Sequence, residues 1–241
     1  MNYRLIAILT IIFIGLGVFF SLIYSPSLEI KDYIVKGNEV LTKSEIVNTI
    51  NKSRDKNILL VNIDKLKDSL LNGERYIKKV MINKIYPNKL ELIISERKPI
   101  AKIINDNTTL VFDSEGYILE EGKSNIKAQV PLLKGVGYSF SKNKIVFTPS
   151  VEKLVQELEE LQFSLIKELN LIQYKQSQNN NSKVELLIMD NNVKVKLGEL
   201  KDLPKKFKIL EAAVLDIKKD NLKIDYINLQ YPEKPVYKTK N

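Results

Sequence analysis

The sequence contains no cysteine, no histidine and no tryptophan. Thiol nucleophiles, disulfide bonds and imidazole bases are therefore excluded, together with every metal site that depends on Cys or His ligands. The lack of cysteine is compatible with a domain outside the cytoplasm but does not require one. Any catalysis would have to use Ser, Thr, Lys, Tyr or carboxylate side chains.

Arginine is scarce as well, although the chain carries 38 basic and 29 acidic residues and a net charge of +9. A net positive charge can indicate nucleic-acid binding. Arginine, however, is the residue that forks onto phosphates and base edges. It occurs here only as Arg4, Arg54, Arg75 and Arg97. The composition therefore favours a solvated, lysine-rich surface and no nucleic-acid partner.

The chain begins with a long apolar run. No residue between Leu5 and Leu28 is charged, and a helix over residues 5–24 would be about 30 Å long, which spans a hydrocarbon core. A cleaved signal peptide is the alternative, but the run is too long and no small-x-small cleavage site follows it. Because Arg4 precedes the run, the positive-inside rule predicts a cytoplasmic tail at residues 1–4 and an extracytoplasmic location for everything after the helix.

A strand and a capped helix are expected next. The alternating residues up to Val35 predict a strand that ends at the turn Gly37–Asn38. Thr42 and Glu45 have the spacing of a capping box, so the following helix should begin at Lys43.

A second helix and two strands complete this first unit. The helix is expected to begin near Asn62, with its inward side made by Leu66, Leu70 and Leu71. The strands Tyr76–Ile85 and Lys89–Glu96 are joined by the turn Tyr86–Asn88. This order predicts a small α+β unit with two helices on a three-stranded sheet.

The rest of the chain predicts a β-rich domain with two amphipathic helices. One helix should open at Thr148 and Pro149, or with Ser150 as its cap, and the other should span Leu203–Lys219 with Asp202 as its cap. A polar loop is expected at residues 176–182. The expected strands are Ala101–Ile104, Leu110–Phe112, Tyr117–Leu119, Ile166–Tyr174, Lys183–Met189, Val193–Leu197 and a last strand, Leu222–Tyr231, which stops at Pro232 and Pro235.

Several segments together resemble a known family. IVKGNEVLTKSEI and YPNKLELIISERKPIA are similar to a polypeptide-transport-associated (POTRA) domain of the bacterial cell-division family FtsQ/DivIB. FDSEGYIL, PLLKG, VKVKLG, KFKILEAAVL and IDYINLQY resemble the second, β-rich domain of that family. The resemblance implies a POTRA domain at residues 28–98, an FtsQ/DivIB-type β domain at 99–231 and a C-terminal tail at 232–241. One departure is that Asn228–Gln230 replaces the family's Asp-Leu-Arg, which affects any charge-dependent contact there.

Candidate catalytic groups have simpler explanations. Ser150 and Lys153 have the Ser-x-x-Lys spacing of penicillin-binding enzymes, but six other serines share it and the partner motifs are absent, so Ser150 is interpreted as a helix cap. The neighbouring carboxylates Glu120–Glu121 and Glu159–Glu160 would point to different sides of a helix. The glycines Gly15 and Gly17 lie in the apolar run and make no phosphate loop. We expect no catalytic, cofactor-binding or metal-binding residue.

The last strand is the candidate recognition element. Its residues Ile227, Leu229, Gln230 and Tyr231 are expected to bind a partner if the strand lies at a sheet edge, where free backbone groups can accept another strand. The alternative is that these side chains complete the core. The resemblance implies that the C-terminal region binds the small division proteins FtsB/DivIC and FtsL.

The resemblance implies a non-enzymatic membrane scaffold with one span, located at the division septum and working without a cofactor. A POTRA-containing export or outer-membrane assembly component is the first alternative. Such proteins carry tandem POTRA repeats ahead of a long β-barrel, whereas one unit and no barrel-length segment are expected here. A membrane-anchored cell-wall hydrolase is the second alternative, and it needs a catalytic group that the composition does not supply.

Overall fold

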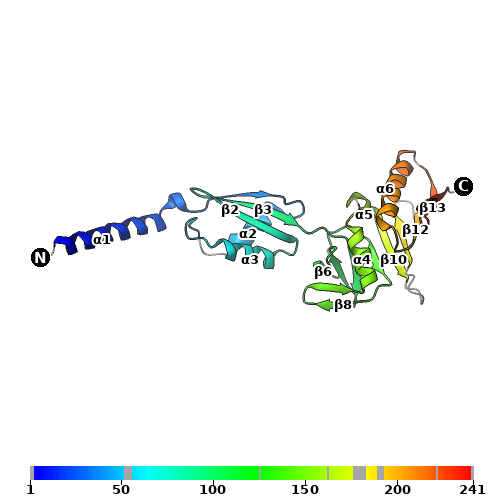
Figure 1. Ribbon diagram of the computed structural model, residues 1–241, viewed down its shortest axis with the longest axis horizontal. Helices are drawn as coiled ribbons and strands as arrows, with labels where there is room; N and C mark the ends of the chain where they lie inside the picture. Colours follow the sequence, from blue (N-terminus) through cyan, green and yellow to red (C-terminus); the bar gives the residue numbers. More distant parts are fainter. Residues whose placement is uncertain are drawn as a thin grey trace. The chain divides into compact units, whose positions relative to one another are not determined.

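The computed structural model describes residues 3–51, 56–124, 126–161, 163–175, 183–188, 193–220 and 222–239. The chain divides into two units, Met1–Arg97 and Lys98–Asn241. Figure 1 traces the helices and strands of both units. Each unit combines helices with a β-sheet around its own core, so the α+β class predicted from the sequence is confirmed.

Unit 1 begins with the apolar helix α1, Tyr3–Ile23. It starts two residues before the expected span of 5–24 and ends one residue earlier, although Tyr24 N still donates to the Phe20 carbonyl at 3.1 Å. Among the described residues, one helical stretch, Ile6–Ile23, is long and apolar enough to cross a membrane, and none of it is buried against the protein.

The order of elements after α1 is the predicted strand, helix, helix, strand, strand. The elements are the short 3-10 helix η1 (Pro26–Leu28), β1 (Asp32–Lys36), α2 (Lys43–Asn51), α3 (Ile63–Gly73), β2 (Ile77–Ile85) and β3 (Lys89–Glu96). The sheet has the order β1-β3-β2, with β1 parallel and β2 antiparallel to β3. Both helices pack on one face of this sheet (Figure 1), and their buried residues form one core with those of the strands.

The two helix starts of unit 1 confirm the cap predictions. Thr42 N donates to the Glu45 carboxylate at 2.8 Å, and Glu45 N donates to Thr42 Oγ1 at 3.3 Å, which is the reciprocal geometry of a capping box. The Asn62 side chain caps α3 by accepting from Lys65 N at 3.0 Å. The prediction that Leu71 faces inward was wrong, because its side chain is 42% exposed. A helix of this length buries a narrow stripe, and Leu66 and Leu70 already fill it.

The loop between β1 and α2 is held by the end of β3. Gly37 has φ of +80°, and a Cβ at this position would lie 2.2 Å from the Ile94 carbonyl oxygen. The Glu96 carboxylate accepts hydrogen bonds from three consecutive backbone amides, at 2.7–3.0 Å. The amides belong to Glu39, Val40 and Leu41. The predicted turn at Gly37–Asn38 therefore depends on the missing side chain of Gly37, which lets the backbone approach Ile94, and on the Glu96 carboxylate.

Unit 2 is built on a nine-stranded sheet of order β14-β13-β12-β11-β10-β7-β4-β5-β6, with a separate hairpin β8-β9. The strands are β4 (Ala101–Asn105), β5 (Thr108–Phe112), β6 (Ile118–Gly122), β7 (Leu132–Lys134), β8 (Tyr138–Ser141), β9 (Lys144–Phe147), β10 (Leu169–Lys175), β11 (Lys183–Ile188), β12 (Val193–Glu199), β13 (Ile224–Asn228) and β14 (Val236–Thr239). The helices are α4 (Pro149–Leu158), α5 (Phe163–Glu168) and α6 (Leu203–Lys219). The apolar sides of α4 and α6 share one core with the sheet.

Several local expectations in unit 2 need correction. Ile166 lies in α5 rather than in a strand, because a short apolar run has no period that separates helix from strand. Thr148 is the N-cap residue of α4 and Pro149 is its first residue, so Ser150 is not the cap. The expected polar loop at 176–182 lies outside the described residues.

The C-terminal edge of the sheet also differs from the prediction. The expected strand Leu222–Tyr231 is shorter, because β13 ends at Asn228. Asn228 Oδ1 then accepts from Gln230 N at 3.1 Å, and Lys234 N donates to the Tyr231 carbonyl at 3.0 Å, which turns the chain back. The strand β14, which lies within the expected tail of residues 232–241, pairs antiparallel with β13. It is β14, and not β13, that forms the last strand of the sheet.

Candidate interaction site at the C-terminal sheet edge

The strand β14 forms an open margin of the sheet that carries two exposed apolar side chains. In the part of the chain that the structure describes, no further strand pairs with its outer side. All four of its side chains are exposed, and Val236 and Tyr237 are 51% and 62% accessible. Unpaired backbone groups beside exposed apolar side chains are the features that accept a partner strand.

The structure separates the four residues predicted to bind a partner into two pairs. Ile227 and Leu229 are buried, at 2% and 0% exposure. Leu229 N also donates to the Lys196 carbonyl at 2.9 Å. These two side chains are part of the core of unit 2, as the alternative interpretation of the sequence predicted. Gln230 and Tyr231 instead lie at the surface, where they line a cavity.

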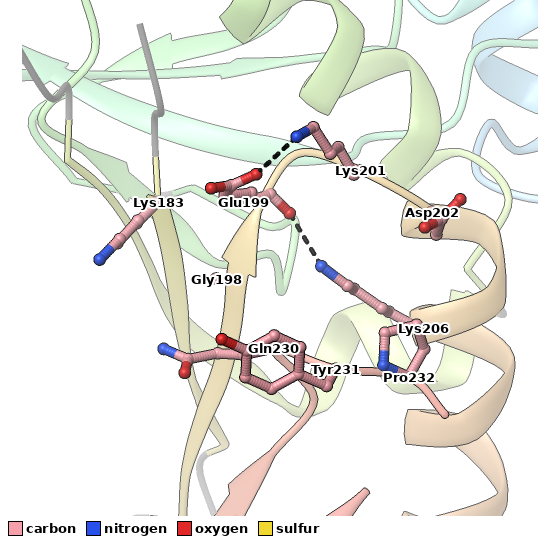
Figure 2. Close-up of a pocket in the computed structure, with 9 residues that line it drawn as sticks. All are labelled: Lys183, Gly198, Glu199, Lys201, Asp202, Lys206, Gln230, Tyr231 and Pro232. Atoms are coloured by element: carbon pink, nitrogen blue, oxygen red, sulfur yellow. Dashed lines mark hydrogen bonds and ion pairs between the residues drawn. The ribbon is translucent and has the colours of Figure 1, made fainter. Parts of the chain in front are cut away.

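This cavity has a volume of about 320 Å³ and lies where β12 ends, α6 begins and the turn after β13 passes. Figure 2 shows Gln230 near the strand β12 on one side of it and Asp202 and Lys206, at the start of α6, on the other. Gly198 lies behind Gln230 with φ of +70°, and a Cβ there would be 2.8 Å from Gln230 Cγ. A glycine is therefore required for Gln230 to lie against β12.

A buried lysine joins α6 to the end of β12. Lys206 is 2% exposed, and its Nζ donates to the carbonyl oxygens of Leu197 at 2.8 Å and Glu199 at 2.9 Å. The contact with Glu199 is visible in Figure 2. Burial lowers the pKa of Lys206, and the nearby carboxylates of Asp202 and Glu199 oppose this shift. The two hydrogen bonds compensate for the loss of hydration of the ammonium group.

Two ion pairs lie at or near the rim of the cavity. Lys201 Nζ lies 2.9 Å from the Glu199 carboxylate (Figure 2), and the hydrogen bond from Lys201 lowers the pKa of Glu199. Lys205, on the first turn of α6, forms an ion pair with Glu233 in the turn that leads to β14. Both side chains of this ion pair are exposed, so it adds a surface contact between α6 and the turn before β14.

The other candidates from the sequence do not converge on a site. Ser150 and Lys153 are both exposed on α4. Glu120 accepts from the amide of Lys127 at 2.7 Å, and Glu159 accepts from Ser114 Oγ at 2.6 Å, so both carboxylates have structural hydrogen bonds. Over the described ranges, no group of three or more acidic, His or Cys side chains could hold a metal ion.

Three features of the site were missed by reasoning from the sequence. Lys206 could have been noticed, because it lies between Leu203 and Leu210 on the apolar stripe of α6. The strand β14 was missed because Pro232 and Pro235 suggested that pairing ends there. Only the close approach of Gln230 reveals the role of Gly198.

Comparison with known proteins gives consistent matches along the chain. The sequence model of the FtsQ-type POTRA domain matches residues 28–97, and the model of the FtsQ/DivIB C-terminal related region matches residues 98–236. The cell division protein DivIB of Clostridium tetani is 26% identical over 88% of this chain and 79% of that protein. The cell division protein FtsQ of Rickettsia bellii is 28% identical over 45% of this chain and 39% of that protein.

A solved structure was also found, the major extracytoplasmic domain of the cell division protein DivIB from Geobacillus stearothermophilus. It is 19% identical, with a TM-score of 0.36, and the match covers 54% of this chain and 99% of that chain. The two sequence models together extend from residue 28 to residue 236, and the second alone covers more than half of the chain. The chain therefore belongs to the FtsQ/DivIB family.

Proposed function

We propose that this protein is a membrane-anchored scaffold of the bacterial cell-division machinery. It has no reaction of its own and acts by binding FtsB/DivIC-like and FtsL-like proteins at the septum. Membership of a family whose relatives are cell division proteins supports the role. The apolar helix α1 supports the anchor, with residues 1–4 in the cytoplasm and both folded units outside it.

The binding surface is the outer side of β14 together with the neighbouring cavity. The observation that carries this assignment is the open margin of β14, with Val236 and Tyr237 exposed on it. A partner segment in extended conformation pairs with the backbone of β14 and places one side chain beside Gln230 and Tyr231. Ile227 and Leu229 hold β13 in the core and thereby fix the position of the surface.

The test is capture of the DivIC-like partner by the full chain in detergent. The double variant Tyr231→Lys, Tyr237→Lys changes two side chains that are 74% and 62% exposed, so the fold should be retained. We expect it to weaken binding by about tenfold or more, because aromatic anchors dominate interface energies. Phe140→Lys is the matched control, since Phe140 is an exposed aromatic residue of β8 in the same unit.

Undiminished binding by the double variant would refute the assignment to β14, and equal losses in both variants would show that added charge alone is responsible. The cellular role is tested separately with a tagged full chain. Enrichment at midcell is expected for a division scaffold. A uniform distribution around the cell envelope would instead favour the export alternative.

A further inference from the structure

Asn57 connects the end of α1 to the folded part of unit 1. Its Nδ2 donates to the carbonyl oxygens of Leu22 at 3.1 Å and Ile23 at 2.8 Å. The last carbonyls of a helix have no partner within the helix, so this single amide serves two of them. The segment that contains Asn57 is therefore located where the apolar helix ends.

Backbone pairing holds this segment in place. Ile30 N donates to the Lys56 carbonyl at 2.8 Å, and Ile58 N donates to the Leu28 carbonyl at 2.9 Å. Residues 56–58 are thus paired with the stretch that directly follows α1. The contact between helix end and loop is part of a hydrogen-bonded structure and does not depend on Asn57 alone.

The turn after Asn57 exposes two leucines. Asn57 Oδ1 accepts from Leu59 N at 2.8 Å, and the Asn57 carbonyl accepts from Leu60 N at 3.1 Å. Ile58 and Val61, on either side, are buried in the core of unit 1. Leu59 and Leu60, in contrast, are 43% and 51% exposed. The turn geometry therefore presents an adjacent pair of apolar side chains to the surroundings.

The hairpin between β2 and β3 contributes to the same end of the unit. Lys31 N, close after η1, donates to the Asn88 carbonyl at 2.9 Å, and Lys84 Nζ donates to the Leu59 carbonyl at 3.4 Å. Ile85 and Tyr86 at the tip of the hairpin are exposed. We call Leu59, Leu60, Ile85 and Tyr86 the helix-end patch.

We propose that the helix-end patch lies in the headgroup region of the bilayer that α1 crosses. The inference rests on the membrane anchor of the proposed function and adds a second membrane contact to it. A lipid surface fits because the patch adjoins the end of the apolar helix and combines leucine, isoleucine and tyrosine with the cation of Lys84. Lys56, 3.9 Å from the Glu29 carboxylate, lies in the same segment. Surfaces that lie in a membrane interface have this composition.

Tyr24 supports the same assignment. It follows α1 directly, is 77% exposed, and its ring stacks on that of Phe20 with centroids 6.4 Å apart. Tyrosines collect at the headgroup level of membranes, where one side of the ring is apolar and the hydroxyl is hydrated. The folded part of unit 1 would thus be held against the lipid surface at two loops, which restricts its rotation about α1.

The absence of tryptophan permits a site-specific test. The full chain carrying Leu60→Trp is reconstituted into vesicles of phosphatidylcholine and phosphatidylglycerol, with or without bromine on the acyl chains near the headgroups. Val40→Trp is the matched control, with an exposure of 48% at the original side chain against 51% for Leu60. Val40 is bonded to Glu96 at the far end of β3, which at eight residues is about 26 Å long.

We expect brominated lipid to remove about half of the Leu60→Trp emission, because an interfacial indole lies within reach of the bromine atoms, and to leave the Val40→Trp emission nearly unchanged. Tyr86→Trp, on the other loop, is a second reporter should Leu60→Trp fail to fold. If the chain remains with the vesicles but all reporters keep their emission, the patch faces water or another protein and the inference is overturned. If the chain separates from the vesicles, the anchor itself is refuted.

Discussion

The ammonium nitrogen of Lys206 lies 2.8 Å from the carbonyl oxygen of Leu197, which places a cation from α6 inside the core at the end of β12. The lysine occupies a position in the buried, otherwise apolar stripe of the helix. It supplies donors to the carbonyl oxygens of Leu197 and Glu199 beside the cavity. Its contribution to stability therefore depends on both hydrogen bonding and protonation.

We expect Lys206→Met to lower the local free energy of unfolding by about 1–3 kcal/mol at neutral pH, because the buried Leu197 carbonyl and the partly buried Glu199 carbonyl lose their donor. The folded pKa of Lys206 is below its ordinary value of 10.5. Between those two values the unfolded chain binds more protons, so the stability of the wild type rises with pH. Hydrogen exchange of β12 amides gives the local free energy of unfolding. The difference in this free energy between wild type and variant should widen as the pH rises toward 10.5. A difference that narrows would contradict this account.

Glu96→Ala should release the loop between β1 and α2. Three backbone amides lose a charged acceptor, and the expected cost is about 1–3 kcal/mol. The readout is faster hydrogen exchange at the amides of Val40 and Leu41. Glu39→Ala is the control, because it removes an exposed carboxylate from the same loop and leaves the Glu39 amide bonded to Glu96. Equal exchange rates in the two variants would exclude the carboxylate as the cause.

Gly116→Ala and Gly137→Ala form a matched pair in unit 2. Gly116 has φ of +81°, and a Cβ there would lie 2.3 Å from the Ile145 carbonyl oxygen. At Gly137 the nearest contact of a Cβ is 3.6 Å away, with Thr148. We expect the first substitution to cost about 1–3 kcal/mol and the second less than about 1 kcal/mol in denaturant titrations of the full chain. Similar costs would mean that the Gly116 turn relaxes freely.

Deletion of residues 236–241 should leave the core of unit 2 intact. The side chains of β14 are all exposed, with Val236 at 51% and Tyr237 at 62%, so the deletion removes backbone hydrogen bonds and only partly covered apolar surface. Amides of β13 that face β14 should exchange faster, whereas amides of β11 and β12 should keep their protection. Loss of protection throughout the sheet would show that β14 stabilises more than its own edge.

Features set by neighbouring residues could be predicted from the sequence. The capping box of Thr42 and Glu45 and the start of α3 at Asn62 depend on hydrogen bonds between residues three positions apart. The local sequence therefore includes every residue that forms these caps. The strand Lys89–Glu96 was predicted with its observed bounds, because its alternation and the preceding turn mark both ends. The family resemblance then placed these elements in the correct order.

Features set by distant residues could not be predicted in the same way. The parallel pairing of β1 with β3 joins segments more than 50 residues apart in the sequence. Glu96 likewise bonds to a loop from which α2 and α3 separate it along the chain. The burial of Lys206 depends on where β12 ends. At the candidate site, partner binding by Gln230 and Tyr231 stays a prediction, and the structure adds that both residues line a cavity. The strand β14 and the exposure of Val236 follow from a turn that only the tertiary structure shows.

The outermost strand of unit 2 is separable from the rest of the sheet in energetic terms. Because every side chain of β14 is exposed, separating the strand from β13 would uncover mainly backbone hydrogen-bonding groups, together with the covered parts of Val236 and Tyr237. An incoming segment could exchange with it at the cost of a few backbone bonds, each of which it would re-form. A partner strand could therefore take the place of β14 beside β13, and the folded core of unit 2 would not have to change.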